Sequence, residues 1–214
     1  MTIIMGVGAV HRIAFASCLF GLLLASPAAP QQLSAKPVSF SFNGQDMKIE
    51  RKLGATQASA DRFAVQPKDC DGLCLAPMQA AADVATIGEN EVTAFLVDVI
   101  QQGEGLLLDA RLPTTRAKGF LPTSVNVPHQ AVEKGNPYRD QILNALGARG
   151  FDGVLNFSDA MELVVFDAGP TDSDAVQLIQ NLLAAGYPSD KLRYYRGGMQ
   201  VWASLGLNYV EKTQ

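Results

Sequence analysis

The sequence predicts an α/β fold, with a central parallel sheet flanked by helices and a small N-terminal extension that contains a β-hairpin. Strands are expected at 105–110, 162–166 and 191–195, and the unbroken apolar character of 162–166 is typical of a strand that is covered on both faces. Amphipathic segments with short connections separate these strands, as in sheets whose helices cross from one parallel strand to the next. A shorter strand is expected at 125–127. We therefore expect one α/β domain in this chain of 214 residues.

The N-terminus has the pattern of a secretory signal peptide. Arg12 precedes an apolar run, and small residues follow that run, so we expect residues 1–29 to be removed by cleavage near Ala28 or Ala29. The run is too short for a comfortable membrane span. Cys18 lies inside the run rather than at its end, which is not the place of a lipoprotein cysteine. We expect a periplasmic or secreted protein without a membrane span after cleavage.

Charge and histidine content exclude several classes of function. The chain has 17 basic and 21 acidic residues, and loss of Arg12 changes the net charge from −4 to −5. A mildly acidic protein without a basic cluster is a poor candidate for binding nucleic acid or an anionic membrane. His129 is the only histidine left after signal cleavage, and it follows Pro128 in a connecting segment. We expect it to be a surface or capping residue, and we expect no metal or other cofactor.

Residues 30–85 form the predicted extension. Residues 38–51 alternate apolar and polar side chains around Asn43-Gly44, a strong hairpin signal, whereas residues 53–72 show no regular pattern. Cys70 and Cys74 are expected to form a local disulfide, because the compartment is oxidising. A redox-active pair or a metal site is a weaker alternative, since the spacing differs from that of either motif. The extension has too few apolar residues for a core of its own and should pack on the main domain.

The main domain, residues 86–214, should contain three amphipathic helices and a short final one. A capping box of Thr86 and Glu89 should start the first helix, and Pro137 the second. Gly186 should end the third, and the final helix should follow Gly197-Gly198. The residues expected to face the core are Val92, Phe95, Leu96 and Val99; Tyr138, Ile142, Leu143 and Leu146; Leu178, Ile179, Leu182 and Leu183; and Met199, Trp202 and Leu205.

Two segments carry a family resemblance. LLLDARLPTTRAKGFLPTSVNVP (106–128) and AAGYPSDKLRYYRGGMQVWASLGL (184–207) resemble two characteristic segments of rhodanese-like domains, in the right order. The matching residues are Asp109, Arg111, Gly119, Pro122, Asn126 and Pro128 in the first segment, and Gly186, Tyr187, Gly197, Gly198, Trp202 and Gly206 in the second. The resemblance covers about 86–210 and implies the three-layer rhodanese-like fold with a central parallel sheet.

The resemblance also identifies the place of the active site and a departure from it. In active members, the third strand ends in a cysteine that takes sulfane sulfur from thiosulfate or a persulfide and passes it to a thiol or cyanide. Asp167 holds this position here, and Asp172 holds that of the usual arginine or second cysteine. A carboxylate forms no persulfide, so we expect a catalytically silent site. The degenerate loop, expected to serve in binding, comprises Asp167, Ala168, Gly169, Pro170, Thr171, Asp172 and Ser173.

Each acidic residue of the loop has a specific expected role. The Asp167 carboxylate should occupy the nest of backbone amides that surrounds a thiolate in active members, keeping the negative charge while removing the chemistry. Asp172 or Ser173 should cap the following helix, with Asp174 in its first turn. A divalent cation site is a weaker alternative, because inward-pointing amides suit anions.

Arg111, with Asp109, and Arg196 lie near strand ends. We expect them to hold loops through salt bridges or carbonyl contacts, with ligand recognition as the alternative. We thus expect an exported binding module with an unidentified protein or small-ligand partner in the cell envelope. The alternative is a sulfurtransferase that works through Cys70 and Cys74. The distance of this pair from Asp167 would discriminate the two.

Overall fold

The structure is a computed structural model that describes residues 36–52, 56–64, 72–151 and 154–211. They belong to one compact unit, residues 35–214. The predicted signal peptide and Cys70 lie outside the described residues. Within the described ranges, no helix is both long enough and apolar enough to cross a membrane.

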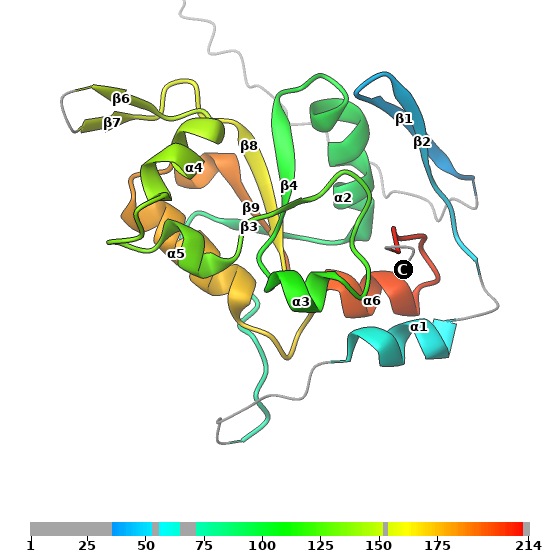
Figure 1. The fold of residues 1–214 in the computed structure, drawn as a ribbon. Coiled ribbons are helices and arrows are strands. Elements are labelled where there is room, and N and C mark those ends of the chain that lie inside the picture. The colour runs from blue at the N-terminus through cyan, green and yellow to red at the C-terminus, as the bar shows by residue number, and fades with distance from the viewer. Residues whose placement is uncertain (1–35, 53–55, 65–71, 152–153, 212–214) are drawn as a thin grey trace, which may run out of the picture. The chain divides into compact units, whose positions relative to one another are not determined.

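A five-stranded sheet forms the centre of this unit, and all its strands are parallel, as predicted (Figure 1). The strand order is β3-β9-β8-β4-β5, so β8 lies in the middle. The strands are β3 (Ala85–Ile87), β4 (Gly105–Asp109), β5 (Val125–Asn126), β8 (Glu162–Phe166) and β9 (Leu192–Tyr195). The loop that follows β8 therefore leaves the sheet at the middle of its carboxyl edge, where open α/β sheets bind ligands.

Helices cover both faces of the sheet, because successive strand residues point to opposite sides. Val164 and Phe166 of β8 pack in one hydrophobic cluster with α2 and α6, whereas Leu163 and Val165 pack in another with α4 and α5. The helices are α1 (Thr56–Phe63), α2 (Glu89–Phe95), which continues into a π-helical turn η2 (Leu96–Ile100), α3 (Pro113–Arg116), α4 (Arg139–Ala145), α5 (Asp174–Ala184) and α6 (Gly198–Ser204), with short 3₁₀ turns η3 (His129–Val132) and η4 (Ser189–Lys191).

The predicted hairpin is confirmed as β1 (Val38–Phe42) and β2 (Gln45–Ile49), which pair in antiparallel fashion. Asn43 and Gly44 both have positive φ, 49° and 75°, as the tight turn requires. Phe40 and Ile49 are buried in the cluster that contains α2 and α6. The extension thus adds its apolar residues to the core of the main domain.

Several predicted details are wrong. Thr86 lies in β3 rather than in a helix cap, and the amide of Gly88 donates to Glu91 Oε2 at 3.0 Å instead. A helix, α1, lies within the segment that was expected to be irregular. Tyr138 does not face the core but is 64% exposed. A second hairpin, β6 (Arg149–Phe151) and β7 (Val154–Asn156), was not predicted.

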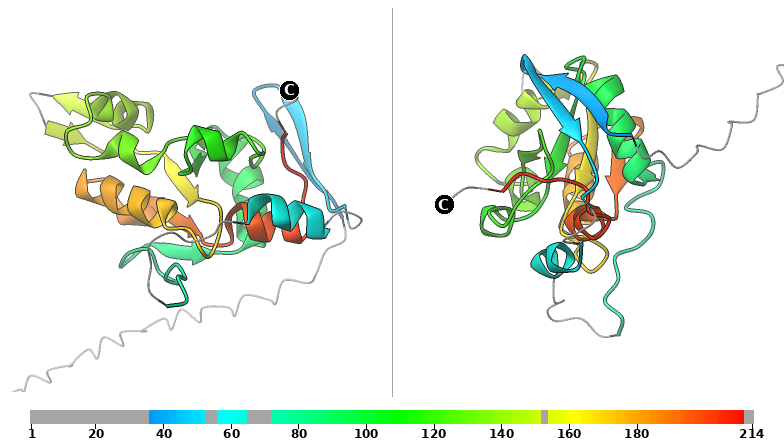
Figure 2. Two further views of the ribbon diagram at one scale, coloured as in Figure 1. Left: turned by 60° about the horizontal axis from the view of Figure 1, so that its bottom comes forward. Right: turned by 90° about the vertical axis from the view of Figure 1, so that its right-hand side faces the viewer.

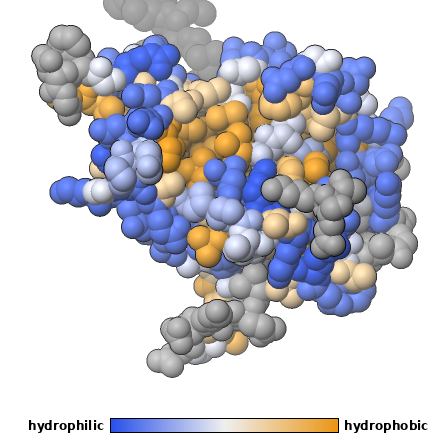
Figure 3. Space-filling model, in the orientation of Figure 1, coloured by the Kyte–Doolittle hydropathy of each residue, from blue (hydrophilic) through white to orange (hydrophobic). Residues whose placement is uncertain are grey.

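The surface in the orientation of Figure 1 is hydrophilic at its periphery. Apolar side chains gather in its middle, over the region between α4 and β4 (Figure 3). The residues that pack partly buried against the α4 and α5 cluster include Leu106 and Ile142. This apolar region lies over the α4 and α5 cluster, away from the carboxyl edge of the sheet, where the chain leaves β8.

Candidate functional site

The candidate site is the connection from β8 to α5, residues 167–173, called the Asp167 loop below. Gly169 has φ 142°, a conformation that other residues rarely adopt, and an added Cβ would lie 3.0 Å from the Cβ of Gln200. The carbonyls of Asp167 and Ala168 accept hydrogen bonds from Met199 and Gln200 at 3.1 and 2.9 Å. The start of α6 thus holds two carbonyls of the loop in place.

Carboxylates of the loop itself accept these amides. Asp167 is fully buried, and its Oδ1 and Oδ2 accept the N–H groups of Gly169 and Ala175, each at 3.0 Å. Asp172 Oδ2 accepts the amide of Ala168 at 3.2 Å. Its Oδ1 accepts those of Ser173 and Asp174 at 2.7 and 3.3 Å. Asp167 and Asp172 therefore cap α5 and bind the amides that an external anion would use.

The buried position of Asp167 changes its acidity. Burial, and then the charge of Asp172, raise the pKa of the Asp167 carboxyl well above its usual range, although the two amide hydrogen bonds oppose this. The sequence suggested that Asp167 keeps the negative charge of a thiolate. This suggestion stays a prediction. Burial, followed by the charge of Asp172, also raises the pKa of Asp174, to about 6.

A buried ion cluster holds the neighbouring loop after β4. Arg111 donates through Nε and Nη2 to the two oxygens of Asp109, at 2.8 and 2.6 Å, and both side chains are buried. Arg116 also donates to Asp109, at 2.7 Å. Arg116 was missed by the sequence reasoning, since nothing in its local pattern links it to Asp109. Arg111 Nη1 is buried and finds no hydrogen-bond partner among the described residues.

His129 is another residue whose position was not predicted. Its side chain is 12% exposed and lies beside the first turn of α5. Its Nε2 lies 3.8 Å from Asp174 Oδ1, and its Nδ1 lies 3.2 Å from Glu133 Oε1. The backbone carbonyl of His129 accepts the side-chain amide of Asn181 at 3.0 Å, which joins η3 to α5. The fold thus brings His129 to the edge of the Asp167 loop.

Comparison with known proteins agrees with this arrangement. A family model for the rhodanese-like domain matches residues 93–205, more than half of the chain. The chain belongs to the rhodanese-like domain family. A search of curated proteins finds no match.

Solved structures with a related fold include other rhodanese-like domains. One is a rhodanese-like domain protein from Staphylococcus aureus, with 18% identity over 61% of this chain and all of that chain, and a TM-score of 0.41. Another is a human single-domain sulfurtransferase, with 24% identity over 56% of this chain and 95% of that chain, and a TM-score of 0.39. A protein of unknown function from Rhodopseudomonas palustris, described as a possible tyrosine phosphatase, has 16% identity over 61% of this chain and 88% of that chain, with a TM-score of 0.43.

In this rhodanese-like domain, residues 72–84, called the strap below, lie against the Asp167 loop (Figure 2, left). The amide of Ala76 donates to the carbonyl of Pro170 at 2.8 Å. Arg196, at the end of β9, donates through Nε and Nη2 to the carbonyl of Ala76, at 3.1 and 3.0 Å. The structure thus places Arg196 on a backbone carbonyl. Cys74 is two residues from this contact, a separation of at most about 7 Å between Cα atoms.

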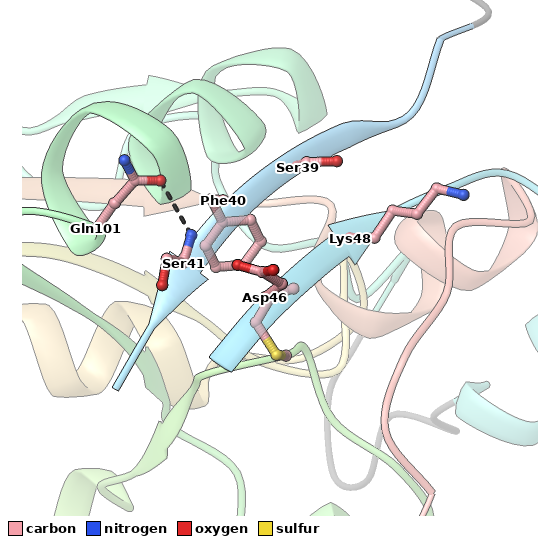
Figure 4. Close-up of a pocket in the computed structure, with 7 residues that line it drawn as sticks. Ser39, Phe40, Ser41, Asp46, Lys48 and Gln101 are labelled. Carbon is pink, nitrogen blue, oxygen red and sulfur yellow. Dashed lines mark hydrogen bonds between the residues drawn. The ribbon is translucent and has the colours of Figure 1, made fainter. Parts of the chain in front are cut away.

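A hollow lies elsewhere on this rhodanese-like domain. It is an open groove against the β1–β2 hairpin, lined by Phe40, Asp46, Lys48 and Gln101 among others (Figure 4). Gln101 Oε1 accepts the amide of Ser41 at 3.0 Å, which joins the hairpin to the end of η2. No residue of the Asp167 loop lines this groove. Among the described residues, no group of three or more His, Cys, Asp and Glu side chains could hold a metal ion.

Proposed function

We propose that this chain is an exported rhodanese-like binding module in which the Asp167 loop performs no sulfur transfer. The observation that carries the proposal is the set of hydrogen bonds from the loop amides to Asp167 and Asp172. Thiosulfate or a persulfide would need these donors and would compete with carboxylates that are covalently part of the site. Proximity favours the internal acceptors, because they lose little freedom on binding.

The charge of the loop supports the same proposal. Asp172 and Asp174 lie beside Asp167, and each raises the pKa of the Asp167 carboxyl. A further anion in this position would meet the same repulsion. Arg111 and Arg116 donate to Asp109 rather than to the carboxylates of the loop. An anionic sulfur donor is therefore disfavoured even if it reaches the loop.

The surface beside the loop supports a protein partner in the cell envelope. Leu73, Leu75 and Met78 of the strap are 85%, 57% and 66% exposed, although their side chains are large and apolar. Such side chains lose contact with water favourably when another surface covers them. Export is supported by the apolar N-terminal run that follows Arg12.

A second candidate function is sulfur transfer through Cys70 and Cys74. The observation that favours it is the position of Cys74, two residues from the strap contact with Pro170. The disulfide between these cysteines remains a prediction. If they pair, a thiol reductant would first have to reduce the pair. The Cys74 thiolate would then attack the outer sulfur of thiosulfate, the S–S bond of thiosulfate would break, and sulfite would leave.

Sulfur loading from thiosulfate tests both functions. Wild type, Asp167→Cys and the matched control Asp167→Ser are incubated with thiosulfate, and gain of a sulfur atom is read by mass spectrometry, with and without a thiol reductant. We expect a gain only in Asp167→Cys, because only this variant has a thiol in the amide nest. Loading of wild type that disappears in Cys74→Ser would refute the first function and support the second.

A further inference from the structure

The strap is held on the Asp167 loop at few points. The amide of Ala76 donates to Pro170, and its carbonyl accepts both donors of Arg196. One further contact joins the strap to β3, where the Thr86 hydroxyl donates to the carbonyl of Met78. Arg196 carries the only charge among these groups, and hydrogen bonds from a charged donor are the stronger kind. The polar attachment of the strap is thus centred on Arg196.

Packing adds little to this attachment. The strap residues that face the core are mostly small, and Ala76, Ala80 and Val84 are buried. The large apolar side chains of Leu73, Leu75 and Met78 face solvent instead. Since the free energy of burial grows with the apolar area removed from water, small inward residues hold a segment weakly.

The backbone of the strap changes direction at two positions of positive φ. Cys74 and Asp83 have φ of 52° and 61°, in the left-handed region, which is disfavoured for Cys74 and better tolerated by an aspartate. They bracket residues 75–82, which include Ala76 and Met78, the residues that make the polar contacts of the strap. A change of φ at these two positions would move the intervening segment as a unit.

We propose that the strap is a hinged cover of the Asp167 loop and that Arg196 is its latch. Cys74 and Asp83 are the hinges, and access to the loop requires that residues 75–82 lift away from Pro170. This proposal rests on the proposed function in one respect, since both take the Asp167 loop as the place where a ligand or partner binds. It adds that binding there is controlled by release of the Arg196 contacts.

Thiol labelling of Asp167→Cys measures how often the cover opens. The rate of reaction with a maleimide is compared in the oxidised protein between Asp167→Cys alone and Asp167→Cys with Arg196→Ala, after subtraction of the wild-type background. Arg193→Ala is the matched control, because Arg193 lies on β9, just before Arg196, and its side chain pairs with Glu162 at 2.6 Å rather than with the carbonyl of Ala76. We expect labelling at least about tenfold faster with Arg196→Ala, since its charge-assisted hydrogen bonds are lost. With Arg193→Ala we expect no comparable change.

Equal labelling rates with Arg196→Ala and Arg193→Ala would overturn the proposal. Hydrogen exchange of the amides in 168–176 gives a second measurement, in which Asp167 is kept. Arg196→Ala should speed this exchange, and unchanged exchange would also refute the cover. These readouts involve no sulfur transfer, so they can fail while the proposed function holds. Conversely, loading of wild type with sulfur would refute the proposed function without affecting the labelling result.

Discussion

Asp167 is expected to stabilise the fold although its own charge is unfavourable. Asp167→Ala would leave the buried amides of Gly169 and Ala175 without their acceptor. Each buried N–H without an acceptor costs about 1–3 kcal/mol, so the two together cost about 2–6 kcal/mol. Removal of the buried carboxyl also removes the free-energy cost of its own burial, and this offsets part of the loss. We expect the free energy of unfolding to fall by about 2–4 kcal/mol.

The pH dependence separates this explanation from simple loss of packing. Because the folded-state pKa of Asp167 is raised, the wild type loses stability as pH rises from about 4 towards that pKa. The alanine variant lacks this loss. The difference between wild type and variant should therefore be largest near pH 4 and shrink as pH rises.

Urea unfolding, followed by the fluorescence of the single tryptophan, buried Trp202, measures both quantities between pH 4.5 and 8. Asp190→Ala is the control, because Asp190 is exposed and lies on η4. A loss below about 1 kcal/mol at pH 4.5, less than one unpaired amide, would refute the reasoning. A difference that grows with pH would also refute it.

Three further predictions concern the same edge of the sheet. The wild type should lose stability as pH rises from about 4 to about 6, because the pKa of Asp174 is raised to about 6, and Asp174→Asn should remove this loss. The rise in the pKa corresponds to about 3 kcal/mol, which solvent screening reduces to about 1–2 kcal/mol. Urea unfolding at pH 4.5 and 7.5 measures the difference. Asp109→Ala should lower the free energy of unfolding by about 3–5 kcal/mol, because Arg111 would stay buried without its partner. Arg116→Ala leaves that pair intact and should cost clearly less, so equal losses would contradict the role given to Arg111. Gly169→Ala should lower the melting temperature more than Gly135→Ala, since both glycines have positive φ but only Gly169 meets a neighbouring backbone and side chain; equal shifts would show that the contact with Gln200 is unimportant.

Sequence alone determined the elements whose signals are local. Asn43-Gly44 specified the hairpin, and the unbroken apolar character of β8 specified a central strand, because turn chemistry and hydrophobic pattern act within a few residues. The register with the family also placed Asp167 at the end of that strand. The segment between β2 and the strap was harder, since α1 gains its stability by packing on the core through Phe63 rather than from a strong pattern of its own.

Only the tertiary structure decided the surroundings of Asp167. Thr86 of β3 pairs with Tyr194 of β9, His129 lies beside Asp174, and Ala76 contacts Pro170. In each pair the two residues are far apart along the chain, so no local pattern links them. The acidity of Asp167 depends in the same way on burial, which is a property of the folded protein. Sequence therefore identified the loop at the end of the central strand, and the fold decided how deeply Asp167 is buried and which amides it accepts.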